Sequence, residues 1–114
     1  MNNKNPFRSE KINSLVFREI TPVIAEYARD IGDYITVTRC ETTKDNKTTR
    51  VFISAISNNA DRALNLLKKN IYDIQGHINS KLKMKITPRI EFYYDETPKF
   101  ASNIEQKIKE ALDT

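Results

Sequence analysis

The fold of this chain is decided by the stretch Asp33–Ser57, which reads DYITVTRCETTKDNKTTRVFISAIS. It is rich in threonine, valine, isoleucine and aromatic residues, the types that favour β-strands. The polar segment KDNK at 44–47 interrupts it and is typical of a tight turn. The stretch therefore predicts a β-hairpin.

The first strand of this hairpin has an irregular alternation. Ile35 and Val37 share one face, whereas Cys40 has the opposite parity. All three side chains can be buried only if one extra residue, near Thr38 or Arg39, resets the phase of the strand. A β-bulge does this, so we expect one at that point.

A helix with one apolar stripe is predicted before the hairpin. Ser9 is the expected N-cap, and Gly32 is the expected stop signal after the last turn. Pro22 lies inside the pattern and removes one helical hydrogen bond, so we expect a kink or a split near Thr21.

The residues after the hairpin predict a helical return to a third strand. Asn58 or Asn59 can cap the helix, and Gly76 weakens it by roughly 1 kcal/mol relative to alanine, so a bent or interrupted helix pair is expected. The segment KITPRIEFYY at 85–94 alternates as a strand does, with Pro88 at its start or on a sheet edge. The segment TPKFASNIEQKIKEAL at 97–112 predicts a short amphipathic helix capped by Ser102.

This order of elements predicts one α+β domain over residues 1–114, with helices on one face of a single sheet. Only about residues 1–7 and 113–114 are expected to be flexible ends. No apolar run reaches the roughly 20 residues of a membrane span, and the N-terminus has no apolar signal region. The single cysteine, Cys40, excludes an internal disulfide and fits a cytoplasmic protein.

Several classes of enzyme site are excluded by composition. One cysteine and one histidine cannot form a zinc pattern, and two glycines cannot form a Walker or GxGxxG loop. No serine lies in a nucleophile-elbow context, and carboxylate pairs such as Asp95–Glu96 are typical of turns. We therefore expect no enzyme, no metal, no cofactor and no small-molecule substrate.

Positive charge is concentrated in residues 62–89. This quarter of the chain holds seven lysines and arginines against one aspartate, within a chain of net charge +4. Clustered cations favour a polyanionic partner because they displace counterions from a phosphate backbone. The alternative interpretation is a solvated helix face beside a charged strand edge.

Nucleic acid is the partner that these cations favour. The helices around Gly76 offer cationic side chains, and free amide groups are expected after that glycine. Phe52, Tyr93 and Tyr94 can stack on bases, although aromatic residues in strands more often belong to a core. The predicted RNA-binding residues are Arg39, Arg50, Lys68, Lys69, Gly76, His77, Lys81, Lys83, Lys85 and Arg89.

Four segments together resemble the ribosome-binding factor A family. They are YITVTRCETTKDNKTTRVFIS (Tyr34–Ser54), IQGHINSK (Ile74–Lys81), KMKITPRIEFYYDET (Lys83–Thr97) and the tail NIEQKIKEAL. The resemblance covers about residues 8–112 and lies in the order and spacing of these segments. It implies a type II KH-like fold with the order helix, strand, strand, helix, kink, helix, strand, plus a short C-terminal helix. The sheet would have three strands, with the third parallel to the first and the kink at Ile74, Gln75 and Gly76.

The resemblance also implies a role in ribosome biogenesis. Members of the family are non-catalytic RNA-binding proteins that assist late assembly of the small (30S) subunit and processing of the 5′ end of 16S rRNA, above all in the cold. The 30S subunit and its 16S rRNA would be the partners of a cytoplasmic monomer. Two alternatives stay open: a KH-type RNA-binding regulator of another target, and a protein-interaction module that uses the Pro88 sheet edge or the C-terminal helix.

Overall fold

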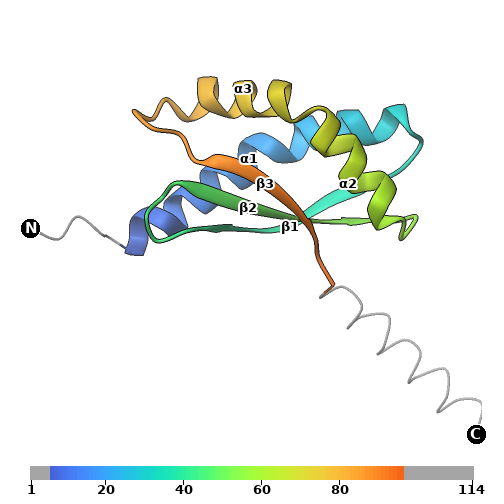
Figure 1. Cartoon of the computed structure of the whole chain (residues 1–114), viewed down its shortest axis with the longest axis horizontal. Helices are drawn as coiled ribbons and strands as arrows, with labels where there is room; N and C mark the ends of the chain where they lie inside the picture. Colours follow the sequence, from blue (N-terminus) through green and yellow to red (C-terminus); the bar gives the residue numbers. More distant parts are fainter. Residues whose placement is uncertain (1–5, 97–114) are drawn as a thin grey trace, which may run out of the picture.

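The structure is a computed structural model that describes residues 6–96, which form three helices and three strands. Figure 1 shows the helices on one side of the sheet, which confirms the predicted α+β architecture. The predicted helix at 97–112 lies outside the described residues. The elements are α1 (Pro6–Asp30), β1 (Ile35–Thr42), β2 (Thr48–Ala55), α2 (Ala60–Lys69), α3 (Ile71–Leu82) and β3 (Arg89–Tyr94).

The hairpin has the predicted bulge. β1 and β2 pair antiparallel, and their register shifts between Val37 and Arg39. Thr38 is the extra residue, and its hydroxyl donates a hydrogen bond to the carbonyl of Phe52 at 3.3 Å. The bulge lets Ile35 and Val37 enter the core while Cys40, after the bulge, also packs against it.

The third strand lies beside the second, and one expectation about it was wrong. The sheet order is β1-β2-β3, and β3 runs parallel to β2 with Thr48 opposite Arg89. It therefore runs opposite to β1, not parallel to it. The reason is the helical return, which carries the chain back to the end of the sheet where β2 begins.

The strand start also differs from the prediction. β3 begins at Arg89, four residues later than the predicted Lys85, and its first residue donates to the carbonyl of Lys47 at 2.9 Å. Pro88 is buried immediately before it, and β3 is an edge of the sheet, as expected. Ile86 lies outside the strand and is exposed.

α1 is longer and more continuous than the sequence predicts. It begins at Pro6, a residue type that suits the first helical position, so Ser9 lies inside the helix and the predicted N-cap was wrong. The helix also passes through Pro22 without splitting. Ile20 and Ile24 are fully buried on either side of this proline, and their packing outweighs the lost hydrogen bond.

The end of α1 confirms the predicted stop at Gly32. This glycine has a positive φ of 65°, and its N–H donates to the carbonyl of Arg29 at 3.0 Å. The N–H of Asp33 donates to Ala28 at 3.0 Å, which completes a Schellman motif. The carboxylate of Asp33 then accepts the hydroxyl of Ser57 at 2.7 Å, so this turn is fixed to the loop before α2.

The break in the helix pair is at Asn70, and the predicted kink at Ile74, Gln75 and Gly76 was wrong. Asn59 caps α2 as expected, because its side chain accepts the N–H of Arg62 at 3.0 Å. Asn70 ends α2 and precedes α3, and its side-chain amide donates to the carbonyl of Leu66 at 2.8 Å. This local hydrogen bond competes with a continuous helix.

Gly76 stays helical because its neighbours are packed. Ile74 and Ile78 are fully buried on either side of it, and this burial outweighs the roughly 1 kcal/mol that a helical glycine costs. Gln75 instead connects α3 to the sheet edge. Its side-chain oxygen accepts the N–H of Ile90 at 2.8 Å, and its amide donates to the carbonyl of Pro88 at 3.0 Å.

Candidate nucleic-acid interface

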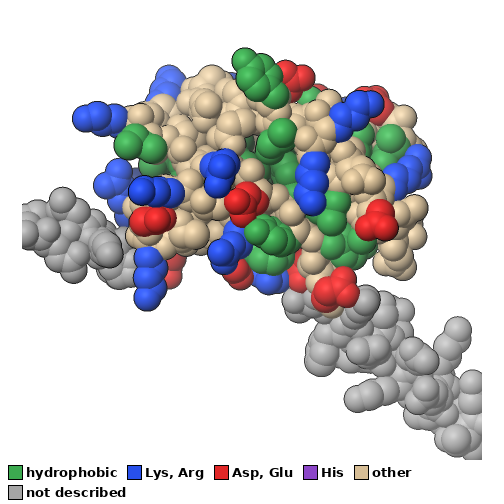
Figure 2. All heavy atoms as spheres, in the orientation of Figure 1, with side chains coloured by type: hydrophobic (Ala, Val, Ile, Leu, Met, Phe, Trp, Pro, Cys, Tyr) green, Lys and Arg blue, Asp and Glu red, His purple; other side chains and the backbone are tan. Residues whose placement is uncertain are grey.

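One end of the molecule gathers cations from three segments that are distant in sequence. Arg8 of α1, Lys47 of the hairpin turn and Lys85 of the loop before β3 line one pocket of about 310 Å³. We call these three residues and this pocket the cationic end. Figure 2 shows blue side chains collected over the end where the hairpin turn, the start of α1 and the loop before β3 meet in Figure 1.

Hydrogen bonds fix these three segments to one another. The Ser9 hydroxyl of α1 donates to the side-chain oxygen of Asn46 in the hairpin turn at 2.8 Å. The Thr42 hydroxyl at the end of β1 donates to Asn13 of α1 at 2.5 Å. The bond from the N–H of Arg89 to the carbonyl of Lys47 attaches the start of β3 to the same turn. The pocket is therefore built by the fold.

Asp45 is the acidic residue that lines this pocket. Its carboxylate accepts the hydroxyl of Thr43 at 2.6 Å and the N–H of Lys47 at 3.0 Å, both within the hairpin turn. These hydrogen bonds, that from Thr43 first, lower the pKa of Asp45. Asp45 thus shapes the turn that presents Lys47.

Lys83, Lys85 and Arg89 were predicted as RNA-binding, and the structure places them on or next to the cationic end. Lys83 ends α3 in a left-handed conformation, with φ of 52°, and all three side chains are exposed. Arg89 approaches Glu91 on its own strand at 3.8 Å. Arg8 and Lys47 were missed, because only the folded chain brings them beside Lys85.

Lys68 and Lys69 lie elsewhere, in the last turn of α2. Both are exposed, and Lys68 lines a groove of about 330 Å³ between the helix pair and the edge strand β3. Glu91 and Tyr93 line the same groove. This is a second, smaller group of exposed cations.

His77 and Lys81 face a different environment from the one predicted. They line a groove between α1 and α3 together with four acidic residues, which are Glu19, Glu26, Asp30 and Asp73. These carboxylates disfavour a phosphate at this place. The free amide groups expected after Gly76 are also absent from this part of the chain, since Gly76 is inside α3.

The face of the sheet opposite to the helices carries a row of stacked groups. Arg39, Phe52 and Tyr93 are partners across the three strands. The guanidinium of Arg39 lies 3.8 Å from the centre of the Phe52 ring, and the Phe52 and Tyr93 rings are stacked at 5.5 Å. Arg39 also pairs with Glu41 and Asp95, at 2.8 Å in both cases.

The next row on this face holds Arg50 between two carboxylates. Its partners across the strands are Glu41 and Glu91. The predicted cations Arg39 and Arg50 are therefore matched by acidic residues of the same face. The ten predicted residues do not form one surface, and the cationic end is the part where positive charge dominates.

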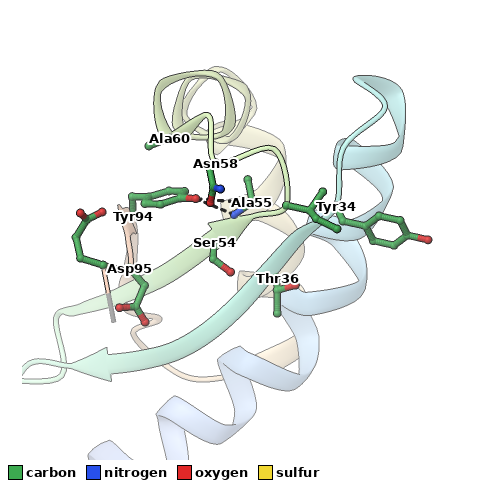
Figure 3. A pocket seen from close by; sticks show the side chains of 10 residues that line it. Tyr34, Thr36, Ser54, Ala55, Asn58, Ala60, Tyr94 and Asp95 are labelled. Carbon is green, nitrogen blue, oxygen red and sulfur yellow. Dashed lines mark hydrogen bonds between the residues drawn. The ribbon is translucent and has the colours of Figure 1, made fainter. Parts of the chain in front are cut away.

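A cavity of about 740 Å³ lies where β1 begins and where β2 and β3 end, and it is unsuited to a polyanion. Its charged lining residues, Asp95 and Glu96, are both acidic. Figure 3 shows the Tyr94 hydroxyl directed at Ala55 and the Tyr34 ring directed outward. The Tyr94 hydroxyl accepts the N–H of Ala55 at 3.2 Å, so Tyr94 has a structural role.

Other site types find no support in residues 6–96. No group of three or more histidine, cysteine or acidic residues there is placed to hold a metal ion. Burial raises the pKa of the Cys40 thiol to about 12. No described helix is long and apolar enough to cross a membrane.

Known proteins resemble this chain over most of its length. The model of the family described as ribosome-binding factor A matches residues 8–108. A ribosome-binding factor A of Clostridium perfringens is 31% identical over 112 residues, which cover 91% of this chain and 97% of that protein.

Solved structures show the same KH-like fold. The crystal structure of ribosome-binding factor A from Thermus thermophilus has a TM-score of 0.66 and 18% identity, and the match covers 75% of this chain and 93% of that one. A Thermus thermophilus model fitted into the cryo-EM map of a 30S complex has a TM-score of 0.53 and 20% identity, covering 69% and 90% of the two chains. With the family model matching residues 8–108, this chain belongs to the ribosome-binding factor A family.

Proposed function

We propose that this protein binds the small ribosomal subunit through its 16S rRNA and assists late assembly and processing of the 5′ end, without catalysing a reaction. The observation that carries the proposal is the cationic end of a chain in this family. The Thermus thermophilus relative fitted into a 30S complex supports the same partner.

The proposed contacts lie where cations outnumber carboxylates. Arg8, Lys47 and Lys85 would hold the RNA backbone, with Lys83 and Arg89 beside them. Lys68 and Lys69 would extend the contact along the helix pair. Of the remaining predicted residues, Arg39, Arg50, His77 and Lys81 would contribute less because carboxylates lie next to them. Gly76 would not contribute an amide group, because it lies inside α3.

The mechanism would be the selective binding of one rRNA conformation. A protein that binds an immature conformation more tightly than the mature one shifts the population toward the first until later steps release it. Many phosphate contacts of this kind make the affinity strongly dependent on salt. Alternative RNA pairings persist longer in the cold, so the need for such a factor should be greatest at low temperature.

Sedimentation with purified subunits tests the proposal. The protein should sediment with small subunits at about 50 mM salt, lose most of the binding by about 200 mM, and not sediment with large subunits. Cells that lack the protein should accumulate 16S rRNA with an extended 5′ end, more so in the cold. Absence of binding to small subunits, or binding that salt leaves unchanged, would contradict the proposal and favour an apolar protein interface.

A further inference from the structure

The pocket at the cationic end has the properties of a preformed ligand site. We infer that Arg8, Lys47 and Lys85 form a phosphate-binding pocket that anchors the sugar–phosphate backbone of the RNA. The inference rests on the proposed function, because it names the part of the protein that holds the RNA. Two of the three cations of this site, Arg8 and Lys47, lie outside the basic stretch at 62–89.

The charges of this pocket are available to a ligand. All three side chains are exposed, and none of them is in an ion pair with a described residue. The Asp45 carboxylate is occupied by Thr43 and by the N–H of Lys47. A phosphate that enters would meet three cationic side chains and the ionised Asp45 carboxylate, which interacts with Lys47. Three positive charges and one negative charge leave the lining with a net charge of two positives, which still attracts a phosphate.

Hydrogen bonds hold the segments around the pocket together. The bonds Ser9–Asn46, Thr42–Asn13 and Arg89–Lys47 join α1, the hairpin and β3 around it. Because these backbone segments are already fixed, binding has to order only the exposed side chains of the three cations.

The apolar part of the lining fits a nucleic-acid backbone better than an isolated anion. Met84 and Ile86 complete the pocket, and Ile86 is 72% exposed. A sugar–phosphate chain presents apolar ribose faces between its charges, which such side chains can cover. Inorganic phosphate would use the cations and leave this apolar wall in water.

A pair of double variants tests the pocket. Arg8→Gln with Lys85→Gln removes two charges from it, and Arg18→Gln with Arg29→Gln removes two exposed charges from elsewhere on α1. Arg29 is 21 residues beyond Arg8, which is about 31 Å along the helix. The probe is a fluorescent oligouridylate of about 20 nucleotides, titrated at several salt concentrations, and an unchanged urea midpoint shows that each variant is folded.

Each single-stranded phosphate contact contributes about −0.7 to the slope of log K against log salt. The pocket variant should lose about 1.4 from the magnitude of the slope, and about 25-fold in affinity at 0.1 M salt, whereas the control variant should match the wild type. Amide NMR signals of Lys47 and Lys85 should shift on titration with the RNA. Equal behaviour of the two variants would overturn the inference.

Two further outcomes separate this inference from the proposed function. A wild-type protein that binds small subunits while its pocket variant binds them equally well would overturn the pocket as the RNA contact, whereas a wild-type protein that does not bind small subunits would contradict the proposed function itself. Inorganic phosphate that produces the same NMR shifts at millimolar concentration, and displaces the RNA, would identify a free anion as the ligand and overturn the RNA assignment.

Discussion

The contact between Gln75 and the edge strand gives the sharpest test of the fold. The Gln75 side chain accepts the N–H of Ile90 at 2.8 Å and donates to the carbonyl of Pro88 at 3.0 Å. It thus makes two hydrogen bonds of the kind that a further strand would make at this edge of the sheet. Gln75→Ala removes both bonds and leaves these backbone groups without their partner. The sequence placed Gln75 in a helix kink instead, and in that interpretation Gln75→Ala would not lower the stability of the protein.

The expected magnitude follows from the two bonds. Each intramolecular hydrogen bond contributes about 1 kcal/mol net, so Gln75→Ala should lower the free energy of unfolding by about 2 kcal/mol. The higher helix propensity of alanine offsets only a few tenths of that. At roughly 4 °C per kcal/mol for a chain of this size, Tm should fall by about 8 °C.

Urea unfolding and amide hydrogen exchange measure this effect. Exchange at the Ile90 amide should accelerate more than exchange in the centre of β2. Asn79→Ala is the matched control, since Asn79 is exposed and accepts the Gln75 side-chain amide at 3.1 Å. A Gln75→Ala protein within about 0.5 kcal/mol of the wild type would show that the contact does not stabilise the edge.

Three other predictions concern single residues. Gly32→Ala should destabilise the protein by about 1 kcal/mol because φ is 65° there, whereas Gly76→Ala in α3 should stabilise it by a similar amount in the same denaturation assay. The Cys40 thiol, with its pKa near 12 against an ordinary 9.0, should react with a disulfide reagent at pH 8 about a thousandfold more slowly than in the unfolded chain. The bond from Ser57 is the main cause that lowers the pKa of Asp33 below 3.8, so the charged form stabilises the fold above that pH, and the contribution is lost as the pH falls through the folded-state pKa. Asp33→Asn should thus be less stable than the wild type at pH 7, and the difference in urea midpoint should close in acid.

Local sequence patterns predicted a structural feature correctly where residues close together in the sequence determine its geometry. The bulge at Thr38 follows from the parity of the apolar residues around it, and the stop at Gly32 follows from the need for a left-handed residue. The cap at Asn59 depends on a bond to a residue three positions later. Each of these features is set within a few residues, so the sequence predicts it.

Features decided by packing could not be predicted in this way. Gly76 remains helical because Ile74 and Ile78 are buried against distant residues, and the local pattern does not show that this burial outweighs the cost of the glycine. The direction of β3 depends on where the helical return ends. The cationic end depends on Arg8, Lys47 and Lys85 lining one pocket, although they are far apart in the sequence. A short segment of sequence therefore cannot reveal it.

The two outer strands of the sheet also bear on how the protein behaves at high concentration. An outer strand with unused N–H and carbonyl groups can recruit a strand of another molecule and begin aggregation. β1 is made irregular by its bulge at Thr38, and the start of β3 is occupied by Gln75, next to a proline that has no N–H to offer. Both borders therefore resist growth of the sheet from one molecule to the next, and a complex built by adding strands at Pro88 is disfavoured.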